Sequence, residues 1–175
     1  LTNLFIVNFY IIQAQILYMF GEFDRNGKLC TIVIEETQSF VVVQPPLKVL
    51  EDSIEYIGSD FKGSLAGARK NTGKSRMCPV MVNYILNICL FPDRGYKSNH
   101  CIWINSNYIR NTKPLDRRTI IEFSNGSSLI VNSRLSAFRE KIHTAAQHRK
   151  MNYERGKNPI SFVLDSKKRP LRKRE

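Results

Sequence analysis

Residues 120–131 read Ile-Ile-Glu-Phe-Ser-Asn-Gly-Ser-Ser-Leu-Ile-Val. Two apolar, β-rich runs lie on either side of the Asn-Gly pair at 125–126, which tolerates the positive φ values that a tight hairpin turn needs. The pattern predicts an antiparallel hairpin made of Ile120–Ser124 and Ser128–Val131, with Phe123 facing a core.

A long helix is expected after this hairpin, from about Ser133 or Ser136 to about Tyr153. Apolar residues recur there at helical spacing and form one stripe, with Ser136 as the expected N-cap. The stripe consists of Leu135, Phe138, Ile142 and Ala145.

The rest of the chain is read from similar patterns, outward towards the N-terminus. Leu47–Ile57 predicts a short helix between Pro46 and Gly58, and the glycine-rich, basic stretch Ser59–Arg76 is typical of a cationic loop. Further strands are expected at residues 9–20, 28–35, 39–43, 79–82, 88–91 and 101–104. We therefore predict an α+β fold: a mostly antiparallel β-sheet domain, a short helix near residues 47–57, a long amphipathic C-terminal helix and a basic tail.

Composition favours one domain with a tail and argues against a metalloprotein or an enzyme. The chain has 175 residues and four cysteines, with no Cys-x-x-Cys pair among them. Cys30, Cys89 and Cys101 lie in apolar runs, so we expect buried thiols in a reducing cytoplasm rather than metal ligands. No motif for hydrolysis, phosphate binding by a Walker loop, or zinc catalysis is present, so we predict no catalytic residues, no metal and no cofactor.

Positive charge is concentrated towards the C-terminus. The net charge is +12, and residues 134–175 carry thirteen Lys and Arg against four Asp and Glu. Such a charge distribution is typical of a protein that binds a polyanion, either nucleic acid or an anionic membrane surface. Residues 154–175 are expected to form a disordered basic tail.

The N-terminal residues 1–20 are strongly apolar, but Asn3, Asn8, Gln13 and Gln15 interrupt the run. A membrane-spanning helix needs about 20 predominantly apolar residues, so we expect no membrane anchor here. We interpret residues 1–9 as an apolar extension and residues 10–153 as the folded domain.

An ordered series of short motifs across this domain resembles the ComK family of bacterial competence transcription factors. The series runs Tyr56-Ile57-Gly58-Ser59, Pro79-Val80-Met81-Val82, Leu90-Phe91-Pro92, Cys101-Ile102-Trp103-Ile104, Phe123-Ser124-Asn125-Gly126 and a last helix with Phe138 and Arg149. The resemblance implies a cytoplasmic, nucleoid-associated activator of competence genes for DNA uptake. It also implies binding to A/T-rich promoter boxes through the minor groove, as a homodimer or tetramer, with RNA polymerase as a further partner. An adaptor of an ATP-dependent protease is also implied, and Ser161–Asp165 is the closest segment to the family's adaptor-binding stretch.

Basic and amide side chains suit the minor groove, which presents mainly acceptors and is strongly negative in A/T tracts. The predicted cationic loop supplies both chemistries, and the last helix offers further cations that could contact phosphates. We predict as DNA-binding residues Lys62, Arg69, Lys70, Asn71, Lys74, Arg76, Arg117, Arg118, Arg134, Arg139, Lys141, Arg149 and Lys150. Arg94 and Lys97 lie in another loop, where surface charge is the commoner explanation.

Two alternatives stay open from the sequence. One is a diverged, nonspecific nucleic-acid-binding protein that has lost activation. The other is a membrane-surface interaction protein that uses the apolar N-terminus and the basic tail. Trp103 fits a core position or a dimer interface equally well.

Overall fold

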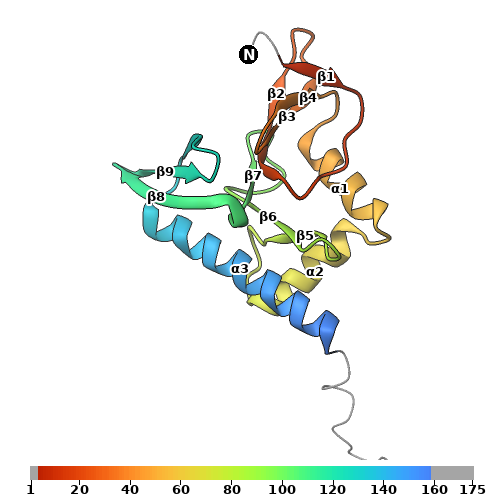
Figure 1. The fold of residues 1–175 in the computed structure, drawn as a ribbon, viewed down its shortest axis with the longest axis vertical. Coiled ribbons are helices and arrows are strands. Elements are labelled where there is room, and N and C mark those ends of the chain that lie inside the picture. Colours follow the sequence, from red (N-terminus) through yellow and green to blue (C-terminus); the bar gives the residue numbers. More distant parts are fainter. Residues whose placement is uncertain (1–3, 159–175) are drawn as a thin grey trace, which may run out of the picture.

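The computed structural model describes residues 4–158 of the chain and contains two β-sheets (Figure 1). The larger sheet has seven strands in the order β1-β4-β3-β2-β7-β6-β5, and all its pairings are antiparallel except β1 with β4. Its strands are β1 Phe5–Val7, β2 Ile16–Phe23, β3 Leu29–Glu35, β4 Ser39–Val42, β5 Val80–Asn83, β6 Ile88–Pro92 and β7 Ile102–Asn105. We refer to this sheet with the helices α1 and α2 as the body.

Helices α1 (Pro46–Tyr56) and α2 (Phe61–Thr72) bury their apolar faces against the larger sheet. Leu50 and Leu65 contribute to this core together with Trp103, which is 1% exposed. Trp103 is therefore a core residue of the monomer. The predicted short helix at Leu47–Ile57 is confirmed within a residue at each end.

Helix α2 corrects the expectation of a loop over Ser59–Arg76. The Asp60 side chain accepts a hydrogen bond from the backbone N–H of Gly63 at 2.8 Å and caps the helix. Leu65 and Ala68 are buried one turn apart, and Gly73 ends the helix in the left-handed conformation at φ 68°. The glycine content of this stretch was misleading. Of the three glycines within residues 59–76, only Gly73 has a positive φ, a conformation that most other residues adopt only with strain.

The smaller sheet has the order β10-β9-β8 and extends away from the body, to the left in Figure 1. Its strands are β8 Ile109–Leu115, β9 Arg118–Phe123 and β10 Ser128–Val131, and a 3-10 turn at Ser106–Tyr108 (η1) connects β7 to β8. The predicted hairpin is confirmed as β9–β10, with Gly126 at φ 83° and Phe123 1% exposed. We call this three-stranded sheet the arm.

Helix α3 (Leu135–Lys157) runs beneath the arm and reaches α2 (Figure 1). Phe138 is fully buried against Phe91, with 5.7 Å between ring centroids, and joins α3 to a second core beneath the arm. The predicted cap is wrong, because Arg134 is the N-cap residue without a side-chain bond and Ser136 lies inside the helix. The helix also continues beyond Tyr153, and the remainder of the expected tail, including Ser161–Asp165, lies outside the described residues.

Two further differences concern strands. Residues 9–20 were expected to form one strand, whereas β2 begins at Ile16 and the preceding segment is held by Tyr10, whose hydroxyl donates to Glu35 Oε1 at 2.6 Å. Strand β8 was not predicted, because Pro114 and two charged residues, Arg110 and Lys113, hide its alternation. Proline is tolerated there because β8 lies at the edge of its sheet. The predicted fold class, α+β with a mostly antiparallel sheet and a long last helix, is confirmed.

Candidate nucleic-acid interface

Two regions of the molecule contain most of the predicted DNA-binding residues. One is the junction where α2 and the segment after it pack against α3. The other is the far end of the arm, around the turn between β8 and β9. The structure gives the side chains of these two regions different surroundings.

At the junction, Asn71 of α2 holds two residues of α3. Its side-chain amide nitrogen lies 3.3 Å from His148 Nδ1, and its carbonyl oxygen accepts a hydrogen bond from the Arg155 guanidinium. His148 is 2% exposed, and this burial together with the nearby Arg155 charge lowers its pKa to about 4. His148 is therefore neutral at physiological pH and serves the packing of α2 on α3.

Two lysines of the junction also have partners within the chain. Lys74 forms an ion pair with Glu140 of α3, which lowers the pKa of that carboxyl group. Lys141 donates to the backbone carbonyl of Asp93, and burial lowers its pKa. Both lysines thus link α3 to the rest of the molecule.

Two of the predicted DNA-binding residues, Arg149 and Lys150, lie in the second half of α3. Arg149 is half-buried near the Cys89 thiol, whose pKa burial raises to about 12. Lys150 is exposed and lies 3.8 Å from Glu154 on the next turn. All four cysteines are buried free thiols, which confirms the predicted burial of Cys30, Cys89 and Cys101.

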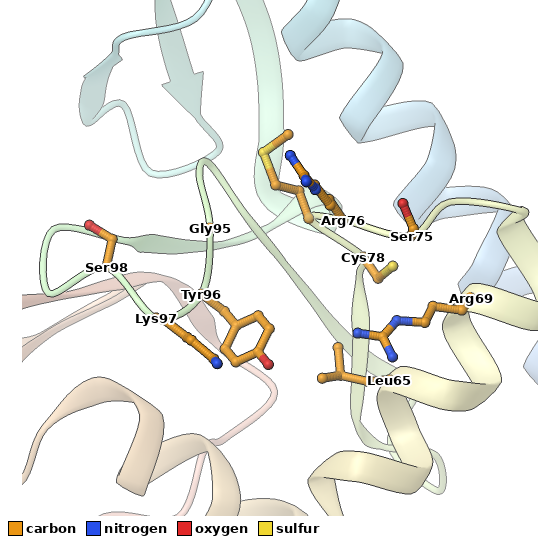
Figure 2. Close-up of a pocket in the computed structure, with 10 residues that line it drawn as sticks. Leu65, Arg69, Ser75, Arg76, Cys78, Gly95, Tyr96, Lys97 and Ser98 are labelled. Atoms are coloured by element: carbon orange, nitrogen blue, oxygen red, sulfur yellow. The ribbon is translucent and has the colours of Figure 1, made fainter.

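On the outer side of α2, two other predicted residues line a hollow with a volume of about 540 Å³. Figure 2 shows Arg69 from α2 and Arg76 from the segment after it, opposite Tyr96 and Lys97 from the loop between β6 and β7. Lys62 and Lys70 are exposed elsewhere on α2. Lys97 was not predicted as a contact, because its loop is distant from α2 in the sequence.

The arm ends in a two-residue turn, Asp116-Arg117, since Leu115 pairs directly with Arg118. Asp116 has a φ of 52°, a left-handed conformation in a residue other than glycine. Arg117 and Arg118 are exposed, and within residues 4–158 no hydrogen bond or ion pair involves either guanidinium. Both side chains are available to a partner.

The base of the arm adds further cations. Arg134 precedes α3, and Arg139 Nε donates to Thr112 Oγ1 of β8 at 3.3 Å. Arg110 and Lys113, which were not predicted, lie on β8, and Lys113 pairs with Glu122 at 2.6 Å. Recognising β8 as a strand would have placed both residues on the arm.

The family model described as ComK protein matches residues 7–157, which include the arm, α3 and all of the body except the start of β1. The chain belongs to the ComK family. This confirms the family resemblance that the sequence motifs carried.

A curated relative of this ComK-family chain is the "Competence transcription factor" of Bacillus subtilis (strain 168). The two are 28% identical over 124 residues, a stretch that covers 70% of this chain and 65% of the relative. The match thus spans just under two thirds of the relative's length. No solved structure matches the chain significantly.

None of the helices within residues 4–158 is both long enough and apolar enough to cross a bilayer. The same residues contain no group of three or more His, Cys, Asp or Glu side chains placed to hold a metal ion.

Proposed function

We propose that this ComK-family chain is a DNA-binding transcription activator of competence genes that recognises A/T-rich promoter boxes through the minor groove. The name of the Bacillus subtilis relative supports regulation of competence genes. The observation that carries the mode of binding is the arm, which presents Arg117 and Arg118 at a narrow turn without partners among the described residues.

The dimensions of the groove favour the arm over α2 as the reading element. An α-helix with its side chains is about 10–12 Å across, whereas the minor groove of B-DNA is about 6 Å wide. Helix α2, which carries Arg69 and Lys70, is too wide to enter that groove. Arg117 and Arg118 lie exposed at a two-residue turn, so their side chains can enter the groove while the strands stay outside it, and A/T tracts strengthen the negative potential that attracts arginine.

The remaining cations then contact the backbone of the same duplex. Arg134 and Arg139 lie at the start of α3, beneath the arm, where phosphate contacts would fix its orientation. Exposed lysines such as Lys62, Lys70 and Lys150 add attraction that depends on salt but not on sequence. Assembly as a dimer or tetramer on paired boxes, contact with RNA polymerase and adaptor-dependent degradation are parts of the same proposal.

Competition binding tests the proposal. The full chain is titrated with a duplex that holds two spaced A/T boxes and with a G/C-scrambled duplex, at about 0.15 M salt, where nonspecific contacts are already weakened. We expect clear preference for the A/T duplex and displacement by netropsin, which occupies the minor groove. Equal affinities for the two duplexes would instead support a nonspecific nucleic-acid-binding protein.

A further inference from the structure

The hollow beside α2 has a wall that combines apolar and cationic side chains. Leu65, Met77 and Tyr96 supply apolar surface, and Arg69, Arg76 and Lys97 supply positive charge from three segments (Figure 2). Its volume of about 540 Å³ lies in the range of small-molecule sites, about 300–1,000 Å³. The hollow is thus of a size and composition suited to a small ligand with both an apolar and a charged part.

The three cations lack a counter-charge. No acidic side chain lines the hollow, and none of the ion pairs formed within residues 4–158 involves Arg69, Arg76 or Lys97. Lys74, at the nearby junction, differs from these three cations because Glu140 supplies it with a counter-charge. Three positive charges around one concave site attract an anion with more than one negative charge, and arginine suits phosphate because its donors are arranged in a fork.

The apolar side of the hollow restricts the ligand further. The Tyr96 ring is fixed by an edge contact with Phe61, at 5.4 Å between centroids and 75° between planes. A held aromatic ring is a surface on which another planar ring can pack. The Ser75 and Ser98 side chains, also at the wall, can donate or accept hydrogen bonds.

We propose that this hollow binds a free, small phosphorylated molecule with a planar ring, of the size of a mononucleotide. Its phosphates contact Arg69, Arg76 and Lys97, and its ring packs against Tyr96. Such a ligand would withdraw Arg69 and Arg76 from DNA and so weaken DNA binding. That consequence rests on the proposed function, whereas the binding of the ligand does not.

Isothermal titration calorimetry of the full chain without DNA tests the site, with ADP as the probe. Adenosine and inorganic pyrophosphate supply the ring and the phosphates separately. We expect ADP to bind more tightly than either fragment by about tenfold or more, because adenosine lacks the phosphates that accept charge-assisted hydrogen bonds and pyrophosphate lacks the ring that packs against Tyr96. Absence of ADP binding, or equal affinity for pyrophosphate, would overturn the proposal.

Variants separate the hollow from general positive charge. The double variant Arg69→Gln/Lys97→Gln should lose about tenfold or more in ADP affinity. The control Lys28→Gln/Lys48→Gln removes the same charge from exposed positions outside the hollow and should bind ADP like the wild type. Equal losses in both variants would mean nonspecific attraction and overturn the site. Unfolding midpoints of both variants are measured first, so that only folded protein is compared.

Two further measurements test whether the ring packs against Tyr96 and whether the ligand is a free small molecule rather than part of a nucleic-acid strand. Tyr96→Leu should bind pyrophosphate as the wild type does. In this variant ADP should bind no more tightly than pyrophosphate, because the ring has lost its packing surface. A 5′-phosphorylated tetranucleotide of single-stranded DNA that bound more tightly than ADP would overturn the assignment to a free small molecule. None of these titrations contains duplex DNA, so their failure leaves the proposed function untouched.

Discussion

Basic residues are frequent both at the junction between α2 and α3 and at the tip of the arm. The two regions differ in whether these side chains have partners within the chain. At the junction, Lys74 forms an ion pair with Glu140. Lys141 donates a hydrogen bond to the backbone carbonyl of Asp93, and Arg155 donates one to the side chain of Asn71. At the tip, the Arg117 and Arg118 side chains have no partner among the described residues. The net charge of a sequence therefore counts cations that form contacts within the fold as well as those available to a ligand.

The largest expected effect concerns the contact that joins α3 to the body. Phe138 is fully buried against Phe91 and anchors α3. Phe138→Ala should lower the free energy of unfolding by about 3–5 kcal/mol, as large-to-small changes of buried aromatics do. Urea unfolding measures this, with Tyr153→Ala on the exposed end of the same helix as control. A loss no larger than that of the control would show that α3 is not held through Phe138.

The next effect concerns the pH dependence of the junction. Burial lowers the pKa of His148 from 6.5 to about 4, so between these values the unfolded chain binds a proton that the folded chain does not. His148 thus costs no stability above about pH 6.5 and destabilises the fold progressively as pH falls towards 4, by about 3 kcal/mol at most. Urea unfolding from pH 7 to pH 4 should show a smaller loss of stability for His148→Gln than for the wild type.

The exposed His143 on the same helix provides the control for this pH series. His143→Gln should lose stability with falling pH as the wild type does. If His148→Gln and His143→Gln gave the same pH profile, His148 would not be the neutral buried group that packs α2 on α3.

A smaller effect is expected from the acidic residue at the tip of the arm. Asp116 has a φ of 52°, which asparagine tolerates well, so Asp116→Asn removes one negative charge without changing the turn. We expect DNA affinity to rise about threefold at 0.15 M salt, because two unit charges about 4 Å apart in water interact with about 1 kcal/mol and salt screens part of this energy. Glu55→Gln on α1, an exposed position away from the arm, should change affinity less. Equal gains would remove any special role of the tip.

Much of the fold could be predicted from the sequence because local patterns coincide with tertiary packing. The Asn-Gly hairpin at β9–β10 and the apolar stripe of α3 are examples. Helix α2 could not be predicted in this way, since glycines at 63 and 67 suggested a loop while burial of Leu65 and Ala68 against the sheet stabilises a helix. Tertiary contacts override weak local preference here.

The site was less predictable than the fold. Sequence identified Arg117 and Arg118 as basic, but only the pairing of β8 with β9 places them at the end of an arm. Nothing in sequence spacing indicates that Lys74 meets Glu140 or that Lys97 lies opposite Arg69. Such long-range pairings depend on the packing of α2, α3 and the β6–β7 loop.

The central claim, that the tip of the arm reads A/T-rich DNA, is tested most directly by Arg117→Gln/Arg118→Gln. The measurement is the ratio of affinities for the A/T-box duplex and the G/C-scrambled duplex, with Lys28→Gln/Lys48→Gln as the control of equal charge. We predict that this ratio falls by about tenfold or more in the arm variant, because the narrow, negative minor groove of A/T tracts attracts arginine more strongly than the minor groove of G/C-rich sequences. The control should keep the wild-type ratio. An unchanged ratio in the arm variant would contradict the account.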